Sequence, residues 1–198
     1  LKSLPFCMKN LINFINSFHI LPEESFKKFQ KLTKLKKFNS KDILAKYGET
    51  PKELFILKSG VVRSYYSNEK GKEYISSLFT PFSATGPLGA LVSNKPSNLS
   101  YACLTDCVLY AINFKELKEL ALQDKNIALM YANALENVFL LLESRIYDLS
   151  ILNATERYLK LKKEIPEIEN LIPQYHIASY LNITSVQLSR IRKKLYNK

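Results

Sequence analysis

The feature that most constrains the fold of this chain is a change of hydrophobic period that occurs twice along its 198 residues. Apolar side chains recur at helical spacing over residues 4–30, where Pro22 opens a second short amphipathic stretch from Glu23 to Leu32. Short β-type runs broken by turn residues then fill residues 33–112. Helical spacing then returns after Asn113. Short strands spaced by roughly 8–12 residues predict an antiparallel barrel or sandwich. We therefore expect an α+β fold in which an N-terminal antiparallel barrel or sandwich is flanked by helices.

The clearest strand pair lies in the middle of the expected barrel or sandwich. The runs 53–57 and 61–66 are separated by Lys58-Ser59-Gly60, and the next turn contains Gly71. Hairpins of this kind favour glycine where the backbone needs a positive φ. We expect Gly60 and Gly71 to adopt that conformation.

Helical spacing continues from Asp124 to about Leu152, a segment ~43 Å long at about 1.5 Å per residue. One set of apolar residues alternates in steps of four and three, which is the spacing of a coiled-coil seam. This set is Ala128, Ala132, Leu135, Phe139, Leu142, Ile146 and Leu149. A second apolar stripe lies beside it, through Tyr131, Val138 and Leu141. A helix packed only on its own domain needs one stripe, so two stripes predict a homodimer.

A division into three parts follows from these patterns. We expect a strand-rich sensor or scaffold domain over residues 1–122, a dimerisation helix over residues 123–152, and a small C-terminal domain over residues 153–198. Within the last part, a helical segment from Thr155 to Glu164 ends before Pro166, and Pro173 precedes the last segment.

The segment from Gln174 to Leu195 has the pattern of a helix-turn-helix. Ala178 supplies the small residue where two helices touch, and Asn182 stands at a turn that needs a left-handed backbone conformation. Thr184 is expected to cap the second helix. The apolar residues suited to the inner faces of both helices are Ile177, Leu181, Ile183, Leu188 and Ile191.

The second helix of this pattern predicts binding of double-stranded DNA. Residues 183–198 contain Arg and Lys but no Asp or Glu, within a chain whose 29 Lys and Arg outnumber its 18 Asp and Glu. Such a helix suits the major groove, with phosphate contacts beside it. The expected base-reading residues are Ser185, Val186, Gln187, Ser189 and Arg190, and the expected phosphate contacts are Thr184, Arg192, Lys193 and Lys194. A solvated basic helix is the alternative.

Nearly the whole chain resembles the Crp/Fnr transcription regulators, in the order roll, long helix and helix-turn-helix. Residues 55–62 (Phe-Ile-Leu-Lys-Ser-Gly-Val-Val) resemble the first roll hairpin of that family, residues 69–73 its next turn, and residues 190–195 the end of its recognition helix. The resemblance implies a cyclic-nucleotide-binding-domain-like roll, a winged helix and a homodimer that reads a palindromic site. The family continues into a β-hairpin wing, whereas this chain stops at Lys198. We therefore expect the wing to be short or absent.

At the place of the family's nucleotide-binding motif, this chain has Gly86-Pro87-Leu88-Gly89. Family members that bind cyclic AMP have Gly-Glu-Leu there, with an arginine ten residues after the Glu; the Glu accepts from the ribose hydroxyl and the arginine neutralises the phosphate. Here Pro87 and Ser97 occupy those two positions. The resemblance therefore implies a degenerate effector pocket that binds neither cyclic AMP nor cyclic GMP. Its residues are Gly86, Pro87, Leu88, Gly89, Ser97 and Asn98, and the neighbouring Lys95 leaves a different small anionic effector open.

The motifs of several other functional classes are missing from the sequence. No Walker loop, nucleophile elbow or pair of carboxylates indicates an enzyme. His19 and His176 are isolated, so we expect no metal or other cofactor, and we expect His176 at the surface. Cys7 stands alone near the N-terminus, which excludes a cysteine cluster for iron and sulfur. Cys103 and Cys107 flank a turn, where buried structural thiols are the first interpretation and a redox pair the alternative.

The expected location is the cytoplasm. Three cysteines make no disulfide framework, and we find no secretory signal pattern near Leu1. The apolar run Val138 to Leu142 is far shorter than the ~20 residues of a transmembrane helix, so we expect no membrane partner.

The lysines of residues 27–41 form a solvated face or, alternatively, a contact with DNA or RNA polymerase. The rival for the whole chain is a small-ligand-sensing or protein-interaction module of the same fold, whose helix-turn-helix does not read DNA.

Overall fold

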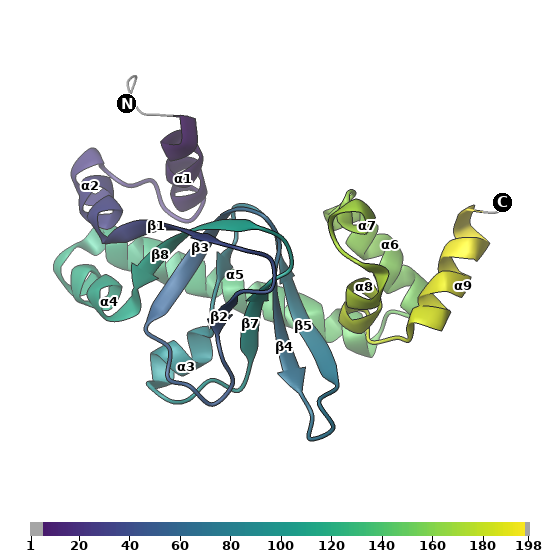
Figure 1. Ribbon diagram of the computed structural model, residues 1–198. Coiled ribbons are helices and arrows are strands. Elements are labelled where there is room, and N and C mark those ends of the chain that lie inside the picture. The colour runs from purple at the N-terminus through teal and green to yellow at the C-terminus, as the bar shows by residue number, and fades with distance from the viewer. Residues whose placement is uncertain (1–5, 197–198) are drawn as a thin grey trace.

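The computed structural model of the protein describes residues 6–196, with side chains from residue 11 onward (Figure 1). The expectations for residues 1–5, for the Cys7 side chain and for a wing beyond residue 196 therefore lie outside the described residues. A central body of strands carries helices at one end and a separate group of helices at the other, next to the C-terminus.

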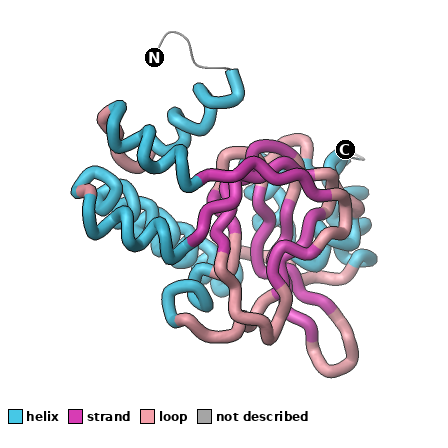
Figure 2. Tube along the Cα trace, turned by 60° about the vertical axis from the view of Figure 1, so that its left-hand side comes forward, coloured by secondary structure: helices cyan, strands magenta, loops and turns pink. Residues whose placement is uncertain are grey.

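The strands form two four-stranded antiparallel sheets, with the orders β1-β8-β3-β6 and β2-β7-β4-β5. Their bounds are β1 Thr33–Phe38, β2 Ile43–Ala45, β3 Glu53–Ser59, β4 Val62–Ser67, β5 Glu73–Phe79, β6 Ala84–Thr85, β7 Ser100–Cys103 and β8 Cys107–Asn113. Buried side chains from both sheets, among them Leu57, Val62 and Leu109, pack together between them. The expected antiparallel roll is therefore present, and Figure 2 shows its strands as one layered body.

The hairpin β3–β4 depends on a glycine at its turn. Gly60 has φ +95°, and Gly71 in the next turn has φ +73°, as the turn sequences predicted. A Cβ atom at position 60 would also lie 2.4 Å from the carbonyl oxygen of Asp106 and 2.6 Å from the sulfur of Cys107. Only glycine therefore permits this close approach between the hairpin and the turn that precedes β8.

The thiols of Cys103 and Cys107 are buried, at 1% and 2% exposure, at the end of β7 and the start of β8. The thiol of Cys107 donates to the carbonyl oxygen of Thr105 at 3.2 Å. A hydrogen bond from the Cys103 thiol lowers the pKa of Cys107 to about 7, and the same bond raises the pKa of Cys103. Their packing among core side chains agrees with the structural interpretation of these cysteines.

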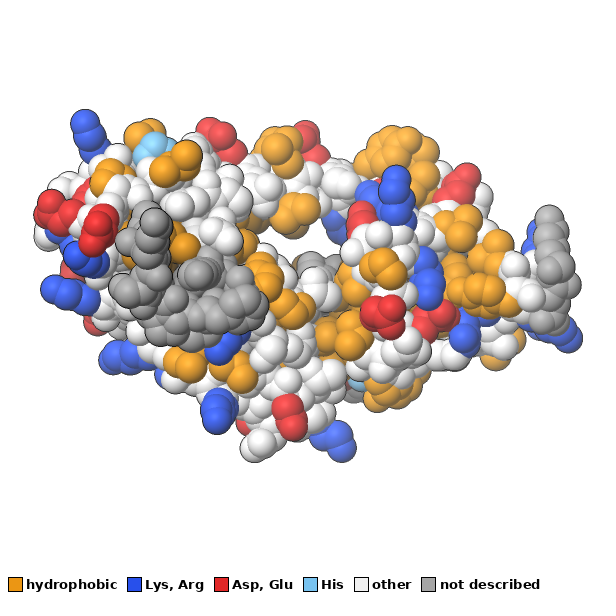
Figure 3. Space-filling view, turned by 90° about the horizontal axis from the view of Figure 1, so that it is seen from above, with side chains coloured by type: hydrophobic (Ala, Val, Ile, Leu, Met, Phe, Trp, Pro, Cys, Tyr) orange, Lys and Arg blue, Asp and Glu red, His pale blue; other side chains and the backbone are white. Residues whose placement is uncertain are grey.

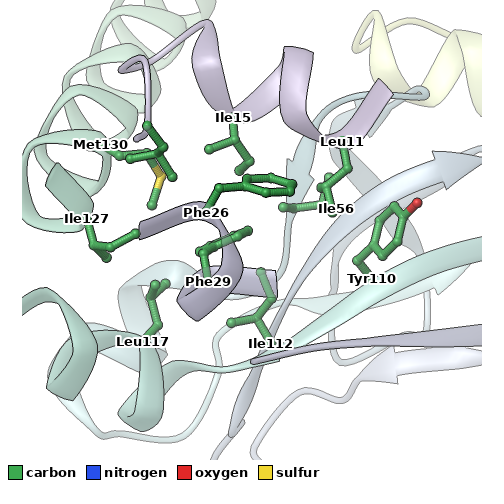
Figure 4. Close-up of a cluster of buried hydrophobic side chains, with 11 residues drawn as sticks. Leu11, Ile15, Phe26, Phe29, Ile56, Tyr110, Ile112, Leu117, Ile127 and Met130 are labelled. Atoms are coloured by element: carbon green, nitrogen blue, oxygen red, sulfur yellow. The ribbon is translucent and has the colours of Figure 1, made fainter. Parts of the chain in front are cut away.

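Four helices cover one end of the roll: α1 Phe6–Asn16, α2 Glu23–Leu32, α4 Phe114–Gln123 and α5 Lys125–Ser150. Their shared core joins α1 and α2 to strand β8 and to the start of α5, as Figure 4 shows. Its buried side chains include Leu11, Ile15, Phe26, Phe29, Ile112, Leu117, Ile127 and Met130. The helical spacing over residues 4–30 corresponds to two helices, and Pro22 precedes the second one, α2, as the sequence predicted.

The start of α5 is fixed by Asp124. Its side chain accepts from the backbone N–H groups of Asn126 and Ile127, which caps the helix. The Ser25 hydroxyl on α2 donates to both carboxylate oxygens, at 3.1 and 2.9 Å. Burial opposes ionisation, yet these hydrogen bonds hold the pKa of Asp124 below its ordinary value. The bond from Ser25 therefore fixes the start of α5 relative to α2.

Length and composition alone qualify α5 to cross a membrane, which the short run Val138–Leu142 did not predict. Its first turns, however, are buried in the core through Ile127 and Met130. Near its other end, Asp148 binds Lys160 of the next helix. Both ends of α5 are thus held by other parts of a globular fold.

The C-terminal helices are α6 Ala154–Glu164, α7 Ile168–Leu171, α8 Gln174–Tyr180 and α9 Ser185–Tyr196. Tyr158, Leu161, Ile177, Leu181 and Leu188 form most of their core, which also receives Val61 from the roll. A capping box of Asn153 and Glu156 starts α6. The short α7 and the helix α3 (Leu88–Ser93) were not expected from the sequence, because neither is long enough to show a helical period.

Candidate functional site

The turn between α8 and α9 has the geometry that its sequence predicted. Asn182 adopts φ +54°, the left-handed conformation expected there. The N–H of Ile183 donates to the carbonyl oxygen of Ala178 at 3.0 Å. Ala178 is 2% exposed, so no larger side chain fits where the two helices touch. This turn directs the start of α9 away from the end of α8.

Thr184 and Gln187 cap the start of α9 reciprocally. The Thr184 hydroxyl accepts from the backbone N–H of Gln187 at 3.1 Å, and the Gln187 side-chain oxygen accepts from the backbone N–H of Thr184 at 2.9 Å. The expected cap at Thr184 is therefore present. It engages the Gln187 oxygen but leaves the Gln187 side-chain NH₂ group available as a donor.

The outer face of α9 carries the residues expected to read bases. Leu188 is fully buried, and Ile191 and Leu195 are half-buried against the same core, so the inner face is apolar. The exposed residues are Ser185, Val186, Gln187, Ser189, Arg190, Lys193, Lys194 and, at the last position, Tyr196. No acidic side chain lies in α9. The helix thus presents uncharged hydrogen-bonding groups near its start, one arginine at its middle and two lysines near its end.

Arg192 does not share this outer face, which differs from its expected role as a phosphate contact. Its Nε lies 2.6 Å from Glu169 of α7, and only 29% of its side chain is exposed. Glu169 also accepts from the Tyr158 hydroxyl at 2.7 Å and from Lys162 at 2.9 Å. Arg192 is therefore part of the packing that joins α9 to α6 and α7.

The start of α9 also borders a cavity of about 640 Å³ on the roll side. Its lining includes Ser185 and Gln187 from α9, Lys72 and Tyr74 from the β4–β5 hairpin, and His176 from α8. Because β5 is an edge strand of its sheet, its backbone is open to the C-terminal helices on this side. The start of α9 and the hairpin therefore face each other across one open space.

Ser179 of α8 forms hydrogen bonds with the edge strand β5. The Ser179 hydroxyl accepts from the N–H of Ile75 at 3.0 Å and donates to the carbonyl oxygen of Glu73 at 3.3 Å. The Glu73 carboxylate in turn pairs with Arg63 at 2.5 Å. The roll and the C-terminal helices are thus connected through backbone groups as well as through side chains.

His176 is buried, at 8% exposure, which corrects its expected surface position. The helical face of α8 that carries His176 packs toward the roll, a contact that the local sequence pattern does not reveal. Burial lowers the pKa of His176 to about 4, and the positive charge of Arg63 acts in the same direction. The ring lies 4.0 Å from that of Tyr175, between centroids. His176 is therefore neutral at physiological pH.

The residues expected to form a degenerate effector pocket lie in α3 and in the segments on either side of it. Pro87 and Ser97 are both buried, whereas Lys95 and Asn98 are exposed. The Ser97 hydroxyl donates to the carbonyl oxygen of Leu99 at 2.7 Å, so it is already engaged within its own loop. The two positions where the resemblance places a carboxylate and an arginine thus carry no charged side chain.

The apolar stripe of α5 lies largely in solvent. Phe139, Leu142, Ile146 and Leu149 are 60%, 56%, 65% and 43% exposed. Ala132 is also exposed, and Ala128 and Leu135 are half-buried. Leu140, Leu141 and Tyr147 widen this surface to more than one seam. In Figure 3 hydrophobic side chains remain at the surface on the face seen from above.

Within the described residues, no group of three or more His, Cys, Asp or Glu side chains gathers in a way that could hold a metal ion. His19 contacts Asn126, at 3.5 Å between ring nitrogen and amide oxygen.

Comparison with known proteins identifies the roll. Residues 35–124 match the family model of the cyclic nucleotide-binding domain. Among curated proteins, no sequence matches the chain.

Solved structures share the fold over most of the chain. FixK2 from Bradyrhizobium japonicum has a TM-score of 0.67 at 19% identity, covering 83% of this chain and 85% of that one. CLP, a c-di-GMP responsive global regulator from Xanthomonas campestris, has a TM-score of 0.63 at 16% identity and covers 88% and 91%. The catabolite activator protein of Thermus thermophilus has a TM-score of 0.57 at 16% identity and covers 91% and 86%. The chain therefore has the fold of these regulators, as the resemblance implied.

Proposed function

We propose that this chain, a cyclic nucleotide-binding-type roll followed by a long helix and a small helical domain, is a homodimeric, sequence-specific DNA-binding transcription regulator. The observation that carries the proposal is the exposed face of α9. It presents Ser185, Gln187, Ser189 and Arg190 in a helix without acidic residues, with lysines at its far end. A surface helix that only contacts solvent does not require uncharged hydrogen-bonding residues at one end and basic residues at the other.

The chemistry of α9 matches the edges of base pairs in the major groove. The groove of B-DNA, about 12 Å wide, admits one helix. Arg190 can donate two parallel hydrogen bonds to guanine O6 and N7, and the free NH₂ group of Gln187 can donate to a base acceptor. Lys193 and Lys194 then contact phosphates, which position the helix without reading sequence.

A second copy of the chain supplies the second recognition helix. The exposed stripe from Phe139 to Leu149 on α5 is apolar and continuous, and another α5 is its natural complement. Two recognition helices held by paired α5 helices would contact half-sites about 34 Å apart on one face of DNA. The expected operator is therefore a palindrome.

Cyclic AMP and cyclic GMP are not the effectors of this regulator in our proposal, because Pro87 and Ser97 provide neither the carboxylate nor the cation that such ligands need. It acts in the cytoplasm, where DNA and RNA polymerase are, without a membrane partner. The lysines on α2 and β1, including Lys27, Lys31, Lys34 and Lys37, are exposed and available to the polymerase or to flanking DNA.

Selection from a randomised duplex library tests the proposal. The full chain should enrich a palindrome with half-sites one helical turn apart and bind it at a ratio of one dimer per duplex. The double variant Arg190→Ala and Lys193→Ala is the matched control, because both side chains are exposed and its fold should be unchanged. If the wild-type chain enriches no sequence and binds all duplexes no better than the control, the fold serves instead as a ligand-sensing or protein-interaction module.

A further inference from the structure

Two arginines from different helices bind the end of α8. Arg145 of α5 donates from Nη2 to the carbonyl oxygen of Tyr180 at 2.5 Å. Arg157 of α6 donates from Nε to the next carbonyl oxygen, that of Leu181, at 3.2 Å. Carbonyl groups in the last turn of a helix have no partner within it, so they are free for such donors. These two lie immediately before the turn that leads into α9.

The contact of Arg145 is held from a second direction. Its guanidinium carbon lies 4.0 Å above the centre of the Tyr180 ring, and the residue is half-buried. A planar guanidinium can stack on an aromatic ring and donate at its edge at once, which the ammonium group of a lysine cannot reproduce. Arg145 therefore fixes both the position and the rotation of the end of α8 relative to α5.

Arg157 holds the joint between α5 and α6. Its second donor, Nη1, binds the carbonyl oxygen of Leu152 at 2.5 Å, in the link between the two helices. Beside that link, Lys160 of α6 donates to both carboxylate oxygens of Asp148 of α5, at 2.7 and 2.6 Å. The α5–α6 joint thus has its own bonds, whereas Arg145 connects α5 directly to the helix that precedes α9.

We propose that Arg145 is a positioning residue that sets the direction of α9 relative to α5, and through it the spacing of the two half-sites that a dimer accepts. This inference rests on the proposed function. The reason is geometric: α8 and α9 form one body with α6 and α7 through the buried side chains of Ile177, Leu181 and Leu188. A rotation of that body about the end of α5 displaces the whole of α9. In a symmetric dimer, the displacement occurs on both sides and changes the distance between the two reading helices.

The first test measures spacing preference. The full chain binds a series of palindromes whose central spacer is shortened or lengthened by one base pair at a time. Wild type should prefer one spacer by about tenfold or more, the range that one or two unfavourable base-pair positions cost. Arg145→Gln should reduce this preference to about threefold or less while the base preference within each half-site stays the same, and Arg145→Lys should restore little of it. The control Arg190→Ala should lose base preference and keep the spacer preference.

The second test needs no DNA. Spin labels are placed on cysteines introduced at exposed Glu136 of α5 and exposed Lys194 of α9, with Cys7 replaced by serine and the native Cys103 and Cys107 protected by burial. Labelled protein is mixed with an excess of unlabelled protein, so that each distance is measured within one protomer. Arg145→Gln should broaden the distance distribution, and its thermal unfolding should show that the domains remain folded.

The outcomes separate the two proposals. An unchanged distance distribution in Arg145→Gln, or an unchanged spacer preference, overturns the positioning role. A broadened distribution in a chain whose wild type binds no duplex selectively supports the role of Arg145 in domain orientation and overturns the proposed function.

Discussion

The Nε atom of Arg192 lies 2.6 Å from a carboxylate oxygen of Glu169, so one basic residue of α9 points into the protein and not toward a partner. Burial opposes the charge of Glu169, but hydrogen bonds from Tyr158 and Lys162 and the charge of Arg192 hold its pKa below the ordinary value. Neighbouring residues of α9 therefore divide into two sets. Arg192 holds the helix in place, whereas Arg190 and Lys193 remain open to solvent.

Arg190→Ala should weaken binding to the cognate duplex by about 1–3 kcal/mol and relax specificity at a single base pair of each half-site. The reason is that a bidentate arginine distinguishes guanine from the other bases. Binding to a set of single-base operator variants is the measurement. An unchanged base preference would show that Arg190 contacts only phosphate.

Arg192→Ala should reduce the stability of the fold, whereas Lys193→Ala should affect only DNA binding. Removal of Arg192 leaves Glu169 short of a partner, so we expect a loss of about 1–3 kcal/mol in the free energy of unfolding. Removal of the exposed Lys193 should leave stability unchanged and lower the salt slope of DNA binding by about one. Denaturant unfolding and salt titrations measure the two quantities. If Arg192→Ala keeps its stability and has a reduced salt slope, Arg192 contacts a phosphate and does not hold α9 in place.

The double variant Leu142→Glu and Ile146→Glu should be a folded monomer. Both side chains are more than half exposed in one protomer, so the charges add no strain there, yet they cannot be buried against a second α5. Sedimentation at micromolar concentration checks this. Leu122→Glu is the control, since Leu122 is 87% exposed on another helix. A wild-type chain that sediments as a monomer would exclude the homodimer.

His176 should make stability depend on pH below neutrality. Its pKa in the folded chain is about 4, below the ordinary value of 6.5, because burial and Arg63 disfavour the charged ring. Between these two values the unfolded chain binds the extra proton, so stability falls as pH decreases from 6.5 to 4, by at most about 3 kcal/mol from this group. His176→Gln should remove that part of the pH dependence. Thermal unfolding across this pH range is the measurement, and equal profiles for the wild type and His176→Gln would contradict it.

Millimolar cyclic AMP or cyclic GMP should leave the melting temperature unchanged. A ligand present at about 100 times its Kd would stabilise the folded chain by about 2.7 kcal/mol, which a thermal shift detects readily. The expected absence of a shift follows from the buried Pro87 and Ser97. A clear shift in the wild type would show that the pocket recognises these ligands through other residues.

Local periodicity predicted most elements of the fold. The alternating runs of residues 33–112 correspond to β1–β8, and the helical spacing after Asn113 corresponds to α4 and α5. The left-handed Asn182 and the cap at Thr184 were also predictable, since both depend on neighbouring backbone groups only. The short α3 and α7 were not, because fewer than two turns leave no repeating pattern.

The candidate site could be predicted only as a set of residues on one helix. The sequence by itself determined which residues α9 contains, where it begins, and that no acidic side chain interrupts its basic end. Only the tertiary structure decided that Arg192 turns inward to Glu169, that His176 is buried beside Arg63, and that Arg145 reaches the end of α8. These contacts join residues far apart in the chain, and a local pattern of apolar and polar residues carries no information about which distant element a given helical face will meet.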